Sequence, residues 1–351
     1  MTDNKSAEKK KLWIFIAIAY GLVAVMSIFM YIGFRRQYDI TAFVNLQMMY
    51  PACGVILGKL ITKSDDDKLP MAGYITVLAT TAVMLVMAVL SLFWRIGPIM
   101  AAGQVIDVWN LLSQFPIMFG SVITYILFWT CGREKRENAG IERRNIRLSV
   151  ILVAVFIALV IGRCMIAVFL EDFRTGTDKE LQAVLAVCRS PLTWVTLLVL
   201  PVNFIMSFIA FFGEEYGWRY YLQPLMQRRF GKRAGVLLLG LVWALWHIDV
   251  DFMFYAKDYG LQAVASQIMT CVASAVFLGY AYMKTENIWV PVIMHYLYNN
   301  LGAIISGGSD SLKDQVIEWN MLPAMAASFI VFFLFIFMPI YRRDAAASPE
   351  Q

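Results

Sequence analysis

The chain has 351 residues, of which 60% are hydrophobic and only 16% are charged. Soluble proteins of this size carry about 25% charged residues, so the composition excludes an ordinary soluble globular protein. The net charge of +5 comes from basic loops between apolar segments and does not indicate a nucleic-acid partner.

Long uncharged segments follow one another along the chain and predict membrane-spanning helices. A helix needs roughly 20 apolar residues to cross the hydrocarbon core. Segments of this kind are Leu12–Phe34, Leu69–Trp94, Val108–Gly132, Ser190–Gly213, Tyr259–Met283, Asn287–Ser309 and Trp319–Tyr341. Further candidates are Ile40–Gly58, Leu148–Leu170 and Ala234–Ile248. The predicted fold is therefore all-α, a polytopic membrane helical bundle of about 8–10 transmembrane helices.

Basic residues are concentrated in alternate loops, including the segment Gly132–Arg147. If the N-terminus is cytoplasmic, 21 of the 30 Lys and Arg residues lie on the same side of the membrane. The positive-inside rule then predicts that both termini face the cytoplasm. Residues 1–11 are expected to be a cytoplasmic tail, residues 12–341 a single transmembrane helical domain, and residues 342–351 a disordered cytoplasmic tail.

One basic residue, Arg163, interrupts the candidate span Leu148–Leu170. A charged side chain inside a span needs a partner or a water-filled cavity. The sequence does not identify that partner.

Polar residues suited to chemistry are concentrated in the second half of the chain. The only two histidines, His247 and His295, both lie in apolar segments, and Glu214 and Glu215 follow a run without charge. Ionisable residues within a membrane are functional candidates, although imidazoles can also simply hold helices together by hydrogen bonds. Counting along the three predicted helices at about 1.5 Å per residue places these four side chains at similar depth. We therefore expect them to form one internal site.

Two pairs of polar residues are spaced to share a helix face. Glu215 and Arg219 are four residues apart in the order that favours an ion pair, and we expect Arg219 to neutralise and orient Glu215. His295 and Asn299 are also four apart, so that an imidazole and an amide can point at one substrate atom. Trp243 precedes His247 by four residues and is expected to pack against it.

Three short patterns occur in order along the chain: EE-x-x-x-R at Glu214–Arg219, an aromatic-x-x-x-His at Trp243–His247, and His-x-x-x-Asn at His295–Asn299. Together they resemble the motifs of the CPBP intramembrane protease family, which includes the CAAX prenyl endopeptidases and bacterial bacteriocin-processing or immunity proteins. The stretches GEEYGWRYYLQP and WALWH are similar to its bacterial members. The motif region covers residues 192–307.

The chain departs from the family pattern in two places. Phenylalanine is common in the family where this chain has Trp243. A proline is common two residues after the second-motif histidine, where this chain has Asp249, followed by Asp251. The two aspartates are expected to mark the exit of the helix at the outer face.

The resemblance implies a CAAX-protease-like intramembrane endopeptidase that hydrolyses a peptide bond in a membrane-associated protein or peptide. Water would be activated by Glu214 with help from His247, and the oxyanion would be stabilised by His295 and Asn299. The supporting pair, Glu215 and Arg219, would fix the geometry.

Cofactor use stays open at the level of sequence. Glu214, His247 and His295 are an acceptable zinc ligand set with one open position. However, H-E-x-x-H is absent from the chain. The favoured interpretation is therefore a reaction that requires no cofactor, with zinc as the alternative.

Two other classes of function use similar residues. The alternative to a protease is a non-catalytic immunity or peptide-binding protein of the membrane that uses the same cavity. A transporter with a buried proton relay would predict broken helices in both halves, which the plain first half does not supply. The expected partners are the lipid bilayer and a peptide or membrane-anchored protein substrate, with no nucleic acid, and the expected location is the plasma membrane of a bacterium. The sequence determines neither the substrate nor the oligomeric state.

Overall fold

The computed structural model of the chain describes residues 2–64, 67–101, 104–305 and 312–342. Among these residues, seven helices are long and apolar enough to cross a membrane, or up to nine if each of two bent helix pairs is one span. This confirms the predicted polytopic all-α membrane bundle. The predicted tail 342–351 lies outside the described residues except for Arg342.

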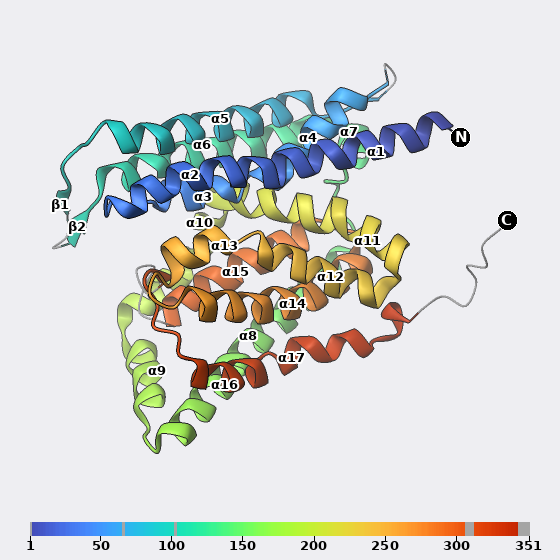
Figure 1. Cartoon of the computed structure of the whole chain (residues 1–351). Coiled ribbons are helices and arrows are strands. Elements are labelled where there is room, and N and C mark those ends of the chain that lie inside the picture. The colour runs from blue at the N-terminus through green and yellow to red at the C-terminus, as the bar shows by residue number, and fades with distance from the viewer. Residues whose placement is uncertain (1, 65–66, 102–103, 306–311, 343–351) are drawn as a thin grey trace.

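The first half of the chain forms long helices and one short hairpin (Figure 1). The helices are α1 (Thr2–Ile16), the π-helical η1 (Ala17–Gly21), α2 (Leu22–Arg35), α3 (Thr41–Gln47), α4 (Tyr50–Thr62), α5 (Met71–Phe93), α6 (Val108–Thr130), α7 (Arg133–Ala139), α8 (Ile146–Thr175) and α9 (Lys179–Arg189). The antiparallel strands β1 (Ile99–Ala101) and β2 (Gln104–Ile106), which the sequence did not predict, join α5 to α6.

The second half carries the motif residues on more broken helices. These are α10 (Pro191–Glu215), the π-helical η2 (Tyr216–Leu222), α11 (Gln223–Phe230), α12 (Lys232–Leu245), α13 (Ile248–Val250), the π-helical η3 (Asp251–Tyr255), α14 (Gly260–Thr285) and α15 (Trp289–Ile305). The chain ends with η5 (Trp319–Met321), α16 (Leu322–Ser328), α17 (Ile330–Phe333), η6 (Leu334–Phe337) and η7 (Pro339–Tyr341).

Three predicted spans differ in detail from the structure. The segment predicted at Trp319–Tyr341 bends by 40° between α16 and α17, and the chain bends by 44° between α12 and α13. The span predicted at Asn287–Ser309 appears as α15, whose 17 described residues are slightly fewer than the roughly 20 that a span needs. Residues 306–309 of that prediction lie outside the described residues.

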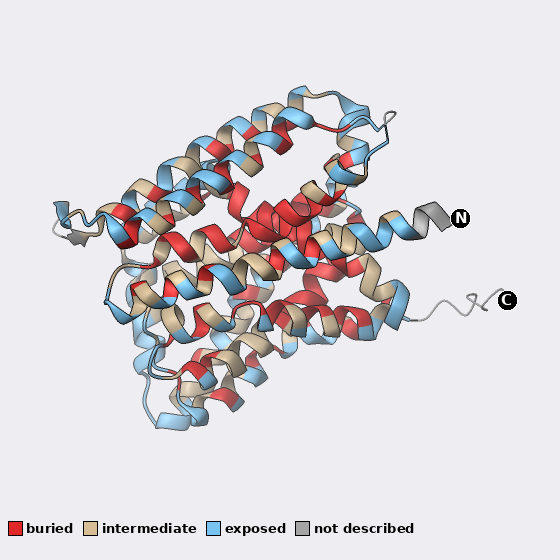
Figure 2. Cartoon of the chain, turned by 45° about the horizontal axis from the view of Figure 1, so that its top comes forward, coloured by how far each residue is buried: buried red, intermediate tan, exposed pale blue. Residues whose placement is uncertain are grey.

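Helix α10 lies in the middle of the bundle and connects its two sides. It packs against α4 and α6 on one side and against α15 on the other, and Figure 1 shows its label between these two groups of helices. Figure 2 shows the buried residues concentrated in this central region. The helix carries the motif glutamates, so they lie in the most buried part of the molecule.

Two glycines allow close packing beside the motif glutamates. A Cβ atom at Gly213 would clash with the backbone carbonyl of Met48, and one at Gly217 would clash with Pro51. The start of α4 therefore lies directly against the backbone of α10 and η2 because neither glycine has a side chain. This contact explains why glycine stands on both sides of the glutamate pair.

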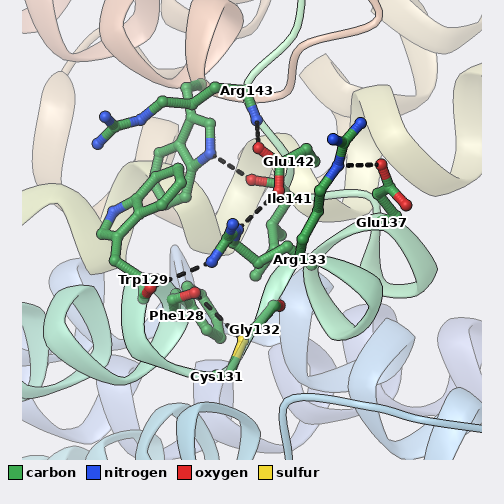
Figure 3. A network of polar contacts seen from close by, with 11 residues as sticks. Phe128, Trp129, Cys131, Gly132, Arg133, Glu137, Ile141, Glu142 and Arg143 are labelled. Carbon is green, nitrogen blue, oxygen red and sulfur yellow. Dashed lines mark hydrogen bonds and ion pairs between the residues drawn. The ribbon is translucent and has the colours of Figure 1, made fainter.

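The predicted basic loop Gly132–Arg147 is folded onto the bundle. It contains α7, and Arg136 forms an ion pair of 2.6 Å with Glu142 in the network of Figure 3. The backbone carbonyl of Ile141 accepts a hydrogen bond of 2.7 Å from the Trp289 indole at the start of α15. Tyr216 of η2 donates a bond of 2.6 Å to the carbonyl of Ala139. The loop thus anchors two of the helices that carry the motifs.

Candidate active site

Glu214 lies at the end of α10, just before the π-helical turn η2, and is 2% exposed. Its Oε2 atom accepts hydrogen bonds from two indoles, at 2.7 Å from Trp243 and at 3.3 Å from Trp218. Its Oε1 atom has no hydrogen-bond partner among the described residues, and the side chain lines a cavity. One carboxylate oxygen is therefore fixed by the protein, while the other is left for a molecule in the cavity.

Glu215 is the centre of a fully buried polar cluster behind Glu214. Its Oε1 atom accepts a bond of 3.0 Å from Arg219 Nη1 and one of 2.8 Å from His295 Nδ1. Arg219 is also fully buried, and its guanidinium lies 4.1 Å from the centre of the Trp243 ring. The ion pair of Glu215 with Arg219 matches the expectation from their spacing, and the contact with His295 links the first motif to the third.

His247 lies at the break between α12 and α13. Its Nδ1 atom is 2.9 Å from the carbonyl oxygen of Trp243, so Nδ1 carries the proton and donates, because a carbonyl can only accept. In the neutral imidazole this leaves Nε2 as an acceptor. The ring of Trp243 packs against the His247 ring at 6.1 Å between centroids, as predicted, and the ring of Trp246 packs against it edge-on at 4.9 Å.

One cavity of about 320 Å³ joins the motif residues. Its described lining includes Glu214, His247, His295 and Asn299, whereas Glu215 and Arg219 lie behind this layer. Helix α14 adds a polar stripe to the wall that the motif patterns did not include: Ser266, Gln267, Thr270 and Ser274. A cavity with this many polar groups can hold water, which peptide hydrolysis requires.

The candidate zinc ligands Glu214, His247 and His295 all line this cavity. In the described parts of the chain, no three His, Cys, Asp or Glu side chains lie close enough together to hold a metal ion. Glu214 Oε2 and the Nδ1 atoms of both histidines bond to protein groups, which leaves Glu214 Oε1 and the two Nε2 atoms for a ligand in the cavity. The separation of the described side chains, and not these hydrogen bonds, is what argues against a metal in this arrangement.

The structure adds residues to the site that sequence reasoning treated as packing. Trp243 was expected only to pack against His247, and both Trp243 and Trp218 donate hydrogen bonds to Glu214. Trp218 follows Glu214 by four residues, so the same spacing rule that identified Glu215 and Arg219 would have paired them. The bond from Trp243 joins two different helices, and no local spacing could have indicated it.

The two aspartates after His247 do not simply mark the exit of a helix. Asp251 is 1% exposed, lines the cavity, and its Oδ2 atom has no partner among the described residues. Asp249 instead accepts hydrogen bonds of 2.6 Å from Ser27 and 3.1 Å from Gln47. The expectation for Asp251 was wrong because the chain bends by 44° after α12, and Asp251 at the start of η3 lines the cavity.

The comparisons with known proteins cover the region that contains the motifs. Residues 193–301 match a family model described as type II CAAX prenyl endopeptidase Rce1-like. This segment carries an Rce1-like domain. It runs from Thr193 near the start of α10 to Leu301 in α15, and it includes all six residues singled out from the sequence. The resemblance stated from the motifs is confirmed for this part of the chain.

A curated relative supports the same assignment. The chain is 25% identical over 138 residues to CAAX prenyl protease 2 of Methanococcus maripaludis, which covers 38% of this chain and 49% of the relative. The chain thus spans about half the length of the curated relative that it matches. No solved structure matches the chain significantly. Helices α1–α9 lie outside the Rce1-like domain.

Proposed function

We propose that this protein is an intramembrane endopeptidase that hydrolyses a peptide bond in a membrane-associated protein or peptide. The observation that carries the proposal is the arrangement of Glu214. Two indoles hold its Oε2 atom, and the side chain lines a cavity shared with His247, His295 and Asn299. A general base must have such access to the proton that it removes.

Attack of water on the peptide carbonyl is the first chemical step. Glu214 Oε1 takes one proton from a water molecule in the cavity. Nε2 of His247 accepts a hydrogen bond from the other O–H group, which stays intact, and so orients the water. The oxygen of the water then forms a bond with the carbonyl carbon. The tetrahedral intermediate carries negative charge on the former carbonyl oxygen.

The oxyanion is stabilised by groups on α15. The amide of Asn299 donates through its NH₂ group. His295 donates through Nε2 only when it is doubly protonated, because its Nδ1 proton is directed at Glu215. The carboxylate of Glu215 accepts the hydrogen bond from Nδ1 of that imidazole, and Arg219 holds Glu215 in place. When the intermediate collapses, the carbon–nitrogen bond breaks and the protonated Glu214 returns its proton to the leaving amine.

The proposed reaction uses no metal ion. In support of this, no three His, Cys, Asp or Glu side chains of the described residues lie close enough together to hold a metal ion. Metal analysis of active protein after treatment with a chelator tests the point. Full activity without bound metal is the expected result, and activity that requires one equivalent of zinc would contradict it.

Purified full-length protein in liposomes tests the function itself. The substrates are internally quenched peptides, one set of which carries a prenylated cysteine, and products are identified by mass spectrometry. Cleavage by Glu214→Gln and His247→Ala should fall by about 10²–10⁴-fold. The matched control is Glu134→Gln on exposed α7, which should cleave as the wild type does.

Two results would change the conclusion. If both site variants cleave as well as the wild type, Glu214 and His247 have been given the wrong roles. If the wild type binds peptides but cleaves none of them, the protein is a peptide-binding membrane protein of the immunity type, which was the alternative from the sequence.

We also propose that the protein is a multi-pass protein of the plasma membrane, with both termini in the cytoplasm. The excess of basic residues on one set of loops supports this orientation. The described chain starts and ends at the same end of the bundle (Figure 1). Reporter fusions after Arg342 and within the α9 region would report opposite sides of the membrane.

A further inference from the structure

Arg163 lies on α8, outside the Rce1-like domain, and its side chain lines the same cavity as the motif residues. It stands in the middle of the candidate span Ile146–Thr175. Arginine stays protonated in proteins, so the wall of the cavity carries a permanent positive charge.

No acidic group neutralises this charge within the described chain. Arg163 forms no ion pair there, and its buried Nε atom has no hydrogen-bond partner. Its guanidinium lies over two aromatic rings, at 4.1 Å from the centre of the Phe329 ring and 5.7 Å from that of Tyr298. Arg219, by contrast, is paired with Glu215. Arg163 is therefore free to bind an anion from outside the described chain.

The charge of Arg163 itself suits an anionic ligand at this point of the cavity wall. Arg163 is the one Lys or Arg in the described lining, and the acidic lining residues, Glu214 and Asp251, lie beyond ion-pair distance from it. A guanidinium binds carboxylates through two parallel hydrogen bonds. Such a pair is stronger at a partly buried position than at the open surface, because the effective dielectric constant is lower there.

The position of Arg163 relates it to the reacting groups. It lies beside Tyr298, which precedes Asn299 and follows His295 by three residues on α15. Residues three apart are neighbours on a helix surface. An anion bound at Arg163 is therefore close to Asn299 and His295, where the oxyanion forms. In an extended peptide, which spans about 3.3–3.6 Å per residue, the residue that carries this anion would be a few residues from the bond to be cleaved.

We propose that Arg163 is a specificity-determining residue that binds a carboxylate of the substrate near the scissile bond. The proposal rests on the proposed function, since it assigns a binding role within the same cavity. The carboxylate has two possible sources, the C-terminus of a peptide and an acidic side chain. Both present the same chemistry to the guanidinium.

Binding is measured separately from cleavage, so that the two proposals can fail independently. The probe is a fluorescent random peptide library, offered in four forms that combine a free or amidated C-terminus with acidic or amide side chains. The protein is full-length Glu214→Gln in phosphatidylcholine nanodiscs, with either Arg163, Arg163→Gln or Arg163→Lys. Gly162→Ala is the control, because a Cβ atom there meets open space.

With Arg163, one carboxylate form should bind at least about tenfold more tightly than its amide partner, as for a charge-assisted hydrogen bond. Arg163→Gln should remove this preference, Arg163→Lys should keep part of it, and Gly162→Ala should keep all of it. The form that is preferred identifies the source of the carboxylate. These results would support the proposal even if the wild type cleaved no peptide.

Two outcomes would overturn the proposal. The first is that the protein with Arg163 binds all four peptide forms equally, or binds none of them. This result would overturn the proposal even if the wild type cleaves peptides well. The other is loss of the carboxylate preference when phosphatidylglycerol is added to the nanodiscs, because Arg163 would then be a site for lipid phosphate.

Discussion

The indole Nε1 of Trp243 donates a hydrogen bond of 2.7 Å to Oε2 of Glu214. The same ring lies under the guanidinium of Arg219, and the backbone carbonyl of Trp243 holds the Nδ1 atom of His247. The aromatic residue of the second motif thus contacts the proposed base, its histidine and the supporting arginine.

We expect Trp243→Phe to lower kcat by about 10-fold with little change in KM, because the ring remains under Arg219 while a hydrogen bond to a charged oxygen is lost. Trp218→Phe removes the longer bond of 3.3 Å and should have a smaller effect. Steady-state kinetics in liposomes compare the two variants. A larger loss for Trp218→Phe would show that the shorter bond is not the one that holds Glu214.

The buried ion pair of Glu215 with Arg219 should show strong coupling in a double-mutant cycle. Glu215→Gln leaves the buried charge of Arg219 without its carboxylate, and Arg219→Gln leaves Glu215 bonded to His295 alone. Each single change should lower the free energy of unfolding by about 3–5 kcal/mol. The double variant leaves neither charge and should lose clearly less than the sum. Unfolding in mixed detergent micelles measures the cycle, and additive losses would mean that the pair contributes no interaction energy.

Gly213→Ala should destabilise the protein by about 1–3 kcal/mol, because the added methyl group overlaps the Met48 carbonyl and forces the backbones apart. Gly162→Ala is the matched control on α8. It meets open space and should raise stability by up to about 1 kcal/mol, as expected for alanine in a helix. Thermal unfolding in detergent compares the two. Equal melting temperatures for the two variants would contradict the close contact of α10 with α4.

The two aspartates after His247 should respond to amide substitution with opposite signs. Asp251→Asn removes a buried carboxylate that has no partner for Oδ2, and we expect the free energy of unfolding to rise by about 1 kcal/mol. Asp249→Asn disturbs the bonds from Ser27 and Gln47 and should lower it by a similar amount. A loss of stability in Asp251→Asn would show that its carboxylate has a partner in solution.

The ion pair between Asp39 and Lys313 should make the stability of the protein depend on pH. Burial by itself raises the pKa of Asp39, but hydrogen bonds from Lys313 and Thr41 outweigh it and lower that pKa below the usual value of about 3.9. A lowered folded-state pKa stabilises the protein above the unfolded-state pKa, and this contribution is lost as the pH falls through the folded-state value.

The variant Asp39→Asn should therefore be less stable than the wild type at pH 7, by about 1 kcal/mol. The difference should shrink below about pH 4. Melting temperatures measured across this range test the prediction. A difference that stays constant down to pH 2 would show that the effect of the substitution is not electrostatic.

The amino-acid sequence was sufficient to predict a helical membrane bundle and to single out the residues suited to chemistry. Long uncharged segments are stable only when they are buried in a membrane or a deep core. Because burying a charged group is costly, Glu214, Glu215, His247 and His295 stand out within such segments. The pairing of Glu215 with Arg219 was also predictable, because their spacing of four residues brings side chains together on any helix.

Only the tertiary structure decided how these residues are connected. The bonds from His295 to Glu215 and from Trp243 to Glu214 join residues 80 and 29 positions apart, so they depend on how helices pack and not on any local period. The same holds for Asp251 and Arg163. Asp251 reaches the cavity through the bend after α12, and Arg163 reaches it because α8 packs beside α15. The surroundings of a buried charge depend on which neighbours the fold places around it.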